Sequence, residues 1–171
     1  MNNGSDEIIR VLHVDDEPDS AELTATHLER VDDRFSVETA TGPAEGLDRL
    51  SERIDCVVSD HEMPEMDGLE FLGAVREQYP ELPSVLFTNE GDEDIASAAI
   101  SAGVTDYFRK SSSMEQYELL ANRVRNAVEQ ARARERADER ERVVGEMNEL
   151  AVIVQDGTIR YTSPGVSELL G

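Results

Sequence analysis

The stretch Ile8–Asp16, IIRVLHVDD, joins a short apolar run to two adjacent carboxylates. The run Ile8–Val14 is rich in Val and Ile and shows little alternation of apolar and polar residues. That composition is typical of a strand buried on both faces of a parallel sheet. The run Ile54–Ser59 has the same character and is also followed by an acidic residue, Asp60. The sequence therefore predicts a buried parallel sheet in which two strands end at carboxylates.

Three other short apolar runs complete the pattern of strands. They are Phe35–Thr39, Pro83–Thr88 and Val104–Arg109. Between the runs, apolar residues recur three or four positions apart, which indicates helices with one buried face. A strand followed by a helix, repeated five times, predicts a doubly wound α/β domain over residues 6–125. We expect a five-stranded parallel sheet of flavodoxin-like order 2-1-3-4-5.

The last helical pattern continues well beyond the end of such a domain. From Met114 to about residue 146 there is no proline, and residues 129–142 consist almost entirely of Arg, Glu, Asp and Ala. Charged residues interrupt the apolar heptad positions, so a charged, solvated helical linker over residues 126–146 is favoured over a long coiled coil. A homodimer formed through this helix is an alternative that the sequence leaves open.

The start of this helix carries a capping signal. Ser112 or Ser113, with Glu115 or Gln116 three residues on, forms a capping-box pattern. In such a box the hydroxyl accepts a hydrogen bond from the first turn, and the Glu or Gln side chain reaches back to the capping residue.

A different pattern follows the helix. Leu150–Val154 and Thr158–Thr162 are β-like runs, and the Asp156–Gly157 dipeptide between them is a strong signal for a hairpin turn. Because a single hairpin is only marginally stable in water, we expect residues 147–171 either to pack on the first domain or to begin a second, partial one.

Charge and composition exclude several classes of protein. Sixteen Lys and Arg residues against 38 Asp and Glu residues give a net charge of −22, which disfavours binding to nucleic acid or to an anionic membrane. No apolar run approaches the ~20 residues that cross a bilayer, and the first residues carry no secretory signal. The single cysteine, Cys56, allows no internal disulfide. We therefore expect a cytoplasmic protein that does not insert into membranes.

The basic residues are unevenly divided between the two types. The chain has 15 Arg and one Lys. Few lysines together with many acidic residues favour a cytoplasm of high salt, because salt screens the repulsion among surface carboxylates. The composition is in this respect similar to that of proteins from extreme halophiles.

Carboxylates follow two of the predicted strands. Asp15 and Asp16 follow the first strand, and Asp60 follows the third. Function in open parallel sheets gathers at the carboxyl ends of the strands, and strands one and three are neighbours in the predicted order. Three carboxylates placed together repel one another unless a cation neutralises them. A hard divalent cation fits oxygen ligands, and Mg²⁺ suits a site that handles phosphate.

A hydroxyl and an ammonium group are expected at the same edge of the sheet. Thr88 and Lys110 end the fourth and fifth strands, and Lys110 is the only lysine in the chain. A carboxylate can act as nucleophile toward phosphorus, while a metal ion and Lys110 neutralise charge on the transferring group. These residues together predict a phosphoryl-transfer site.

Several motifs, taken in order, resemble the receiver domain of two-component response regulators over about residues 7–125. They are Asp15-Asp16, the run DHEMPEMDG over Asp60–Gly68, Thr88, and the run YFRK over Tyr107–Lys110. The resemblance implies a phosphoacceptor signalling domain rather than an enzyme acting on other substrates. Its phosphodonor would be a histidine kinase or a phosphotransfer protein.

The resemblance also implies roles for single residues. Asp60 would accept the phosphoryl group. Mg²⁺ would be bound by Asp60, by Asp16 directly, by Asp15 through water and by the backbone carbonyl of Glu62. Thr88 and Lys110 would contact the phosphoryl group.

A conformational change is part of what the resemblance implies. Tyr107 would turn inward when Thr88 moves. The change would be read out at the face formed by the fourth helix, the fifth strand and the fifth helix, which is also a candidate surface for a homodimer.

Two residues beside the predicted site depart from the family pattern, and one of them is Asn89, which follows Thr88 where a small residue is common. Ser111 stands where the family usually has a proline with a cis peptide bond, so Lys110 must be positioned by other means or through a costly non-proline cis bond. His61, beside Asp60, is expected to be exposed and uninvolved, and His13 to be a packing residue.

Other interpretations of the chain stay open. The run DGTIRY over Asp156–Tyr161 and the last three residues resemble the opening of a PAS sensor domain, so the chain fits the front of a larger hybrid sensor kinase. A Mg²⁺-binding interaction module that is never phosphorylated is a second alternative. A phosphatase with an aspartyl nucleophile is disfavoured, because its DxDx[TV] motif is missing after the first strand.

Overall fold

The computed structural model describes residues 7–89, 93–150, 152–155 and 158–162. The chain divides into two compact units, Met1–Ala131 and Arg132–Gly171. Among the described residues, none of the helices combines the length and the apolar character that crossing a membrane requires.

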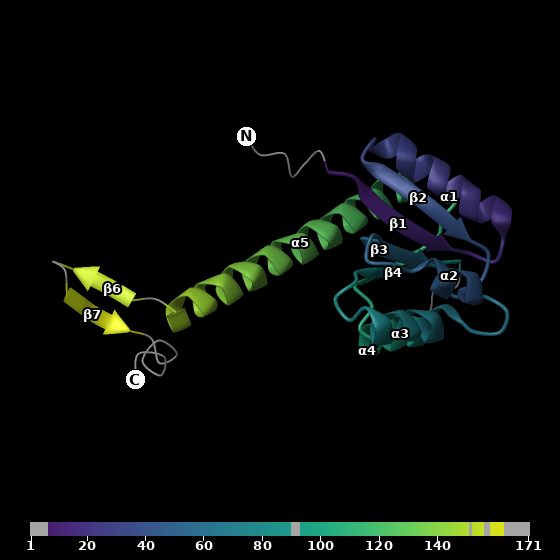
Figure 1. The fold of residues 1–171 in the computed structure, drawn as a ribbon. Coiled ribbons are helices and arrows are strands. Elements are labelled where there is room, and N and C mark those ends of the chain that lie inside the picture. Colours follow the sequence, from purple (N-terminus) through teal and green to yellow (C-terminus); the bar gives the residue numbers. More distant parts are fainter. Residues whose placement is uncertain (1–6, 90–92, 151, 156–157, 163–171) are drawn as a thin grey trace. The chain divides into compact units, whose positions relative to one another are not determined.

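The first unit is built around a parallel sheet that alternates with helices (Figure 1). The sheet has five strands in the order β2-β1-β3-β4-β5, which confirms the predicted fold class and strand order. The elements are β1 (Ile9–Val14), α1 (Pro18–Val31), β2 (Phe35–Ala40), α2 (Pro43–Arg49), β3 (Cys56–Ser59), α3 (Gly68–Gln78), β4 (Ser84–Thr88), α4 (Glu93–Ser101), β5 (Asp106–Arg109) and α5 (Glu115–Leu150).

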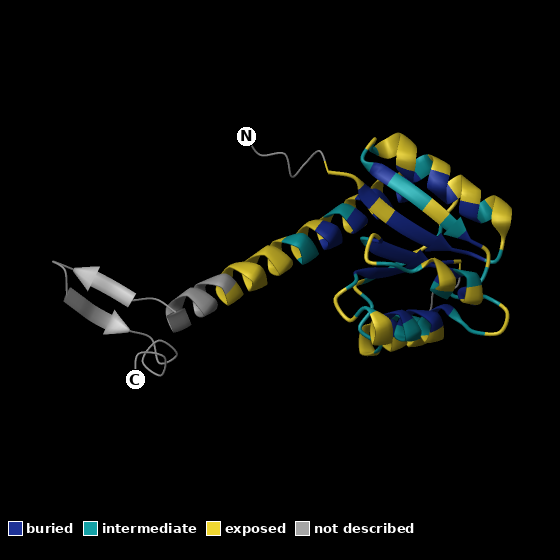
Figure 2. Cartoon of the chain, in the orientation of Figure 1, coloured by how far each residue is buried: buried dark blue, intermediate teal, exposed yellow. Residues whose placement is uncertain are grey.

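Helices cover both faces of this sheet, because the central strands place apolar side chains on each side in turn. In β1, Ile9 and Val11 belong to a core cluster that contains residues of α1 and α5. Leu12 and Val14 belong to a second cluster, built with residues of α3 and α4 and covered at its edge by Leu47 of α2. Figure 2 shows the result, with the central strands β1, β3 and β4 mostly dark blue, the edge strand β2 mostly teal, and yellow patches on the helices.

The strand register brings the ends of the strands to one edge. Val14, the last residue of β1, pairs with Ser59, the last residue of β3. Asp60 continues this ladder, since its backbone N–H donates to the carbonyl of Val14 at 2.8 Å. The backbone N–H of Lys110 likewise donates to the carbonyl of Thr88 at 2.8 Å. The residues that follow strands β1, β3, β4 and β5 therefore share the carboxyl edge of the sheet.

Strands β3 and β5 each begin two residues later than their apolar runs. β3 begins at Cys56 rather than Ile54, because the backbone N–H of Ile54 closes a turn onto the carbonyl of Ser51. β5 begins at Asp106 rather than Val104, because the Val104 N–H bonds back to the carbonyl of Ala99 at the end of α4. These two backbone N–H groups therefore form hydrogen bonds within local turns and not with a neighbouring strand.

The extended C-terminal helix is confirmed as α5, which contains 36 residues. Its first turns bury a stripe at helical spacing that includes Leu120, Val124 and Val128. Residues 133–142 are all exposed, which is the solvated character expected of the charged segment (Figure 2).

The second unit contains the predicted hairpin. Strands β6 (Val152–Gln155) and β7 (Thr158–Thr162) pair antiparallel, with an irregularity in register at Ile153 and Val154. Asp156, Gly157 and the PAS-like pattern in residues 163–171 lie outside the described residues.

Candidate functional site

Three carboxylates meet at the carboxyl edge of the sheet. Asp15 and Asp16 follow β1 and Asp60 follows β3, and one oxygen of each lies within 4.8 Å of the others. Asp15 is 1% exposed and Asp60 8% exposed, whereas Asp16 is the most open of the three. The structure thus brings together the acidic residues that the sequence places 44 positions apart, since 60 − 16 = 44.

Backbone donors hold the two buried carboxylates in place. Oδ1 of Asp60 accepts a hydrogen bond from the N–H of His61 at 2.8 Å. Oδ1 of Asp15 accepts one from the N–H of Glu17 at 3.0 Å, just before α1 begins at Pro18. The loop after Asp60 is closed by Gly68, whose N–H donates to the carbonyl of His61 at 2.8 Å.

Lys110 supplies a positive charge beside these carboxylates. Its Nζ lies 2.9 Å from Oδ2 of Asp15 and 3.9 Å from Oδ1 of Asp60. The hydroxyl oxygen of Ser20 lies 3.5 Å away, and the ring of Phe87 lies beneath the ammonium group with its centroid at 5.5 Å. The Lys110 side chain is only 11% exposed, so water screens these interactions weakly.

Burial and charge shift the two buried carboxyl groups in opposite directions. Burial, together with the neighbouring charge of Asp15, raises the pKa of Asp60 in spite of Lys110, the His61 N–H and the side chain of Thr88. Burial also acts to raise the pKa of Asp15, but hydrogen bonds from Glu17 and Lys110 outweigh it and hold that pKa below its ordinary value. The charged form of Asp60 is therefore disfavoured in its present surroundings, and a further cation beside it would stabilise that form.

The remaining predicted site residues lie around this cluster. Thr88 is 1% exposed at the end of β4, where its side chain hydrogen-bonds to Asp60. Tyr107, in β5, is half-buried and packs against the core cluster on the α3 and α4 side of the sheet. Glu62 is exposed in the loop between β3 and α3.

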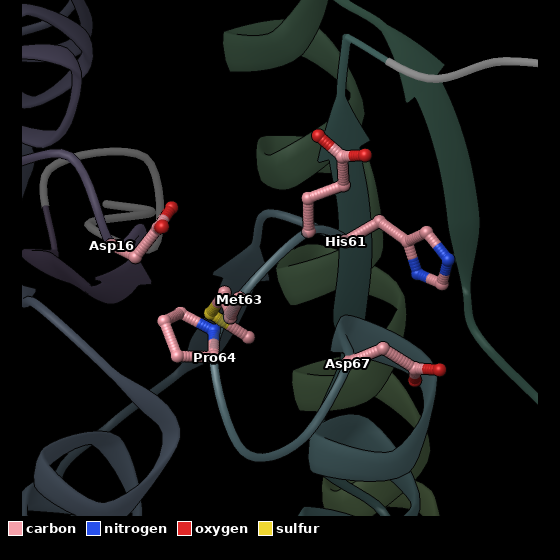
Figure 3. A pocket seen from close by; sticks show the side chains of 6 residues that line it. Asp16, His61, Met63, Pro64 and Asp67 are labelled. Atoms are coloured by element: carbon pink, nitrogen blue, oxygen red, sulfur yellow. The ribbon is translucent and has the colours of Figure 1, made fainter.

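An open cleft of about 420 Å³ borders the carboxylates. It is lined by Asp16, His61, Glu62, Met63, Pro64 and Asp67. Figure 3 shows Asp16 on one side of the cleft and His61 and Asp67 on the other. Solvent and small ligands therefore reach the site from the side of the β3–α3 loop.

Two histidines near the site differ in environment. His61 is half-buried and lines the cleft, so the prediction that it is exposed was wrong. The hydrogen bond from the Gly68 N–H to the His61 carbonyl holds His61 against the start of α3 and so reduces its exposure. His13 is fully buried, as expected of a packing residue, and its Nδ1 lies 3.0 Å from the carbonyl oxygen of Val58. Burial lowers the pKa of His13 to about 4, so its ring is neutral at pH 7.

Gln116 takes part in the site's support in a way that the sequence did not reveal. Ser113 caps α5, since its Oγ accepts from the N–H of Glu115 at 3.2 Å, but Gln116 does not complete the capping box. Its side chain bonds instead to both backbone groups of Ser111. The Lys110–Ser111 peptide bond is trans, so the costly cis alternative does not occur. The missing proline was the one signal that something else must hold this loop.

The donor set fits a hard divalent cation. Three carboxylate oxygens gathered within 4.8 Å offer the ligands that Mg²⁺ prefers, and the open side at Asp16 leaves room for the waters that this ion retains. Asp15, Asp16 and Asp60 would hold such an ion, while the expected contribution of the Glu62 backbone carbonyl stays a prediction.

Comparison with known proteins agrees with this fold and this acidic pocket. The model of the response regulator receiver domain matches residues 11–122, and the chain belongs to this family. Members of the family are phosphoacceptor signalling modules rather than enzymes. The resemblance noted from the sequence is thereby confirmed.

Individual relatives show the same extent of similarity. The chain is 36% identical over 101 residues to the transcriptional regulatory protein GlrR of Escherichia coli (strain K12), covering 58% of this chain but only 22% of GlrR. The solved structure of a receiver domain protein from Clostridium thermocellum superimposes with a TM-score of 0.66 at 26% identity, covering 74% of this chain and 98% of that one. For chemotaxis protein CheY4 of Vibrio cholerae the TM-score is 0.62 at 30% identity, covering 68% of this chain and 98% of that one.

The family match covers only part of the chain. The family model ends at residue 122, within α5. The resemblance to a PAS domain and the inference of a high-salt cytoplasm find no support in the comparisons, and both stay hypotheses. So do the domain boundaries at residues 125 and 146.

Proposed function

We propose that this receiver domain accepts a phosphoryl group on Asp60 from a histidine kinase or a phosphotransfer protein in the cytoplasm, in a Mg²⁺-dependent reaction. The observation that carries the proposal is the gathering of three carboxylates, each with an oxygen within 4.8 Å of the others, beside the Nζ of Lys110. A purely structural ion pair would need one carboxylate, and gathering two more beside it, of which Asp60 is buried, is costly unless a divalent cation binds.

The side chains present can perform an in-line transfer. A carboxylate oxygen of Asp60 attacks the phosphorus as the P–N bond of the donor phosphohistidine breaks, and the released imidazole takes a proton from solvent. When bound, Mg²⁺ neutralises charge on the transferring phosphoryl oxygens. Lys110 places a second positive charge near the same oxygens, and the Thr88 hydroxyl can donate a hydrogen bond to one of them.

Phosphorylation would then bias the packing of the elements beside the site. It adds ~1.5 to 2 negative charges and new acceptor oxygens at Asp60. The phosphoryl oxygens would attract the Thr88 hydroxyl and the Lys110 ammonium group. The movement of Thr88 would let Tyr107, which is half-buried, turn inward. The face formed by α4, β5 and α5 would change, and with it the linker. We expect that face or the linker helix to mediate any homodimer.

The experiment is labelling of the full chain with acetyl phosphate in Mg²⁺ or in EDTA. We expect a Mg²⁺-dependent label that hydroxylamine removes, since an aspartyl phosphate is an acyl phosphate. Asp60→Asn should abolish it, whereas Asp48→Asn, at an exposed position on α2, should not. A label that persists in Asp60→Asn would contradict the proposal, and Mg²⁺ binding without any label would favour a binding module.

A further inference from the structure

A single side chain holds the backbone of the residue after Lys110. Oε1 of Gln116 accepts a hydrogen bond from the N–H of Ser111 at 2.8 Å. Nε2 of Gln116 donates to the carbonyl of Ser111 at 2.6 Å. Gln116 is 8% exposed whereas Ser111 is exposed, so both bonds are partly shielded from water on the Gln116 side.

This amide is one of several constraints on the same short loop. On one side of Ser111, the N–H of Lys110 donates to the carbonyl of Thr88 at 2.8 Å and extends the pairing of β4 with β5. On the other side, the N–H of Ser113 donates to Oγ of Ser111 at 3.2 Å. The loop between the sheet and the first turn of α5 is therefore held by hydrogen bonds at Lys110, Ser111 and Ser113.

The loop determines where the Lys110 ammonium group can reach. The four-carbon stem of Lys110 is flexible, so its position depends on the direction in which the Cα–Cβ bond leaves the backbone. With the loop as observed, Nζ reaches both Asp15 and Asp60. The Lys110–Ser111 bond is trans, so peptide geometry alone does not set this direction.

We propose that Gln116 is a positioning residue for Lys110. It fixes Ser111 and thereby aims the ammonium group of Lys110 at the carboxylates and at the phosphoryl group that Asp60 would carry. This inference rests on the proposed phosphoacceptor function. A primary amide is suited to the task because it offers one donor and one acceptor to a residue that presents both.

The test uses the fact that Lys110 is the only lysine. Lysine labelled with ¹³C at Cε gives one side-chain NMR signal for the full chain. In EDTA, Asp15→Asn removes the ion-pair partner of Lys110. The chemical shift of Cε in that variant gives the reference value for a Lys110 without this ion pair. We expect Gln116→Met, which has similar length but neither hydrogen bond, to move the signal in the same sense. The matched control is Gln130→Met, an exposed position on the same helix.

The rate of phosphorylation by acetyl phosphate gives the second measurement. At saturating Mg²⁺ the rate of phosphorylation should fall about tenfold in Gln116→Met, because the ammonium group of Lys110 would no longer lie beside the transferring phosphoryl group. The Mg²⁺ concentration for half-maximal rate should not rise, because no carboxylate is altered. Gln116→Glu keeps the acceptor for the Ser111 N–H, so its rate of phosphorylation should lie between the rates of the wild type and of Gln116→Met.

The outcomes separate this inference from the function on which it rests. An unmoved lysine signal in folded Gln116→Met overturns the positioning role, whatever the rate. A loss of rate accompanied by weaker Mg²⁺ binding also overturns it, since the whole site would then have collapsed. If Gln116→Met does not fold, the lysine signal of Gln116→Glu decides. An unlabelled wild type refutes the proposed function, while the lysine signal still decides the role of Gln116.

Discussion

Lys110 lies closer to Asp15 than to Asp60 and donates a hydrogen bond to Asp15. Nζ of Lys110 lies 2.9 Å from Oδ2 of Asp15 but 3.9 Å from Oδ1 of Asp60. Both carboxylates belong to the candidate metal site, so the ammonium group and a divalent cation neutralise the same charges. We therefore expect Lys110 to stabilise this pocket when no divalent cation is bound.

Replacing Lys110 should make the stability of the fold depend on Mg²⁺. In EDTA, Lys110→Met leaves the buried Asp15 without its ion-pair partner, and we expect the free energy of unfolding to fall by about 3 kcal/mol. Mg²⁺ should restore most of that loss. Urea unfolding in EDTA and in Mg²⁺ measures both values. Arg109→Met, at the exposed neighbouring position, should respond alike in the two buffers. An equal loss for Lys110→Met in both buffers would show that Lys110 does not stand in for the metal.

Two glycines on α3 should respond in opposite ways to the same substitution. A Cβ at Gly68 would overlap the backbone carbonyl of Asp60 and lie 2.8 Å from Cα of His61, whereas a Cβ at Gly73 would meet nothing within 4 Å. We expect Gly68→Ala to lower the free energy of unfolding by about 1 to 3 kcal/mol and to slow phosphorylation, because it displaces Asp60. Gly73→Ala should raise it by about 0.5 to 1 kcal/mol through helix propensity. Denaturant melts and labelling rates of both variants test this, and a harmless Gly68→Ala would mean that the loop is not so tightly closed.

An ion cluster should anchor the first half of α5 to the loop before β2. Oδ2 of Asp32 lies 2.9 Å from Nη1 of Arg125 and 3.1 Å from Nη2 of Arg34. Hydrogen bonds from Arg34 and Arg125 lower the pKa of Asp32 to about 2, so its contribution is present above the ordinary pKa and lost only as pH falls toward 2. At pH 7, Asp32→Asn should cost about 1 kcal/mol of unfolding free energy, less in 1 M NaCl. Asp33→Asn, exposed beside it, is the matched control. A cost equal to that of Asp33→Asn would show that the cluster contributes nothing.

The sequence was sufficient for the fold and the acidic site because both depend on strong local signals. The Val- and Ile-rich runs before Asp15 and Asp60 are continuous enough to specify buried parallel strands, and parallel strands must end at one edge. What the sequence could not supply is the choice of partner within the site. Lys110 lies near two carboxylates, and its distances to them depend on where the folded loop places its backbone, which no local sequence signal gives. The amide of Gln116 had two local partners available as well, the capping residue of its own helix and the loop before it, and the tertiary position of the loop selected the second.

His13 should make the metal-free protein sensitive to mild acid. Burial lowers the pKa of His13 to about 4, against 6.5 for an exposed imidazole. Below pH 6.5 the unfolded chain binds a proton at this ring while the folded chain does not, so stability is fully present above pH 6.5 and declines as pH falls toward 4. The loss over that interval is on the order of 3 kcal/mol.

His13→Asn can place an amide N–H where Nδ1 now lies, and so keep a hydrogen bond to the carbonyl of Val58 without being able to take up a proton. We expect its free energy of unfolding in EDTA to vary less with pH between 6.5 and 4 than that of the wild type. The ring resonances of His13, identified by their loss in His13→Asn, should keep their neutral positions down to pH 5. A wild type and a variant with the same slope, or a His13 ring that titrates near pH 6.5, would show that the buried ring accepts a proton without cost.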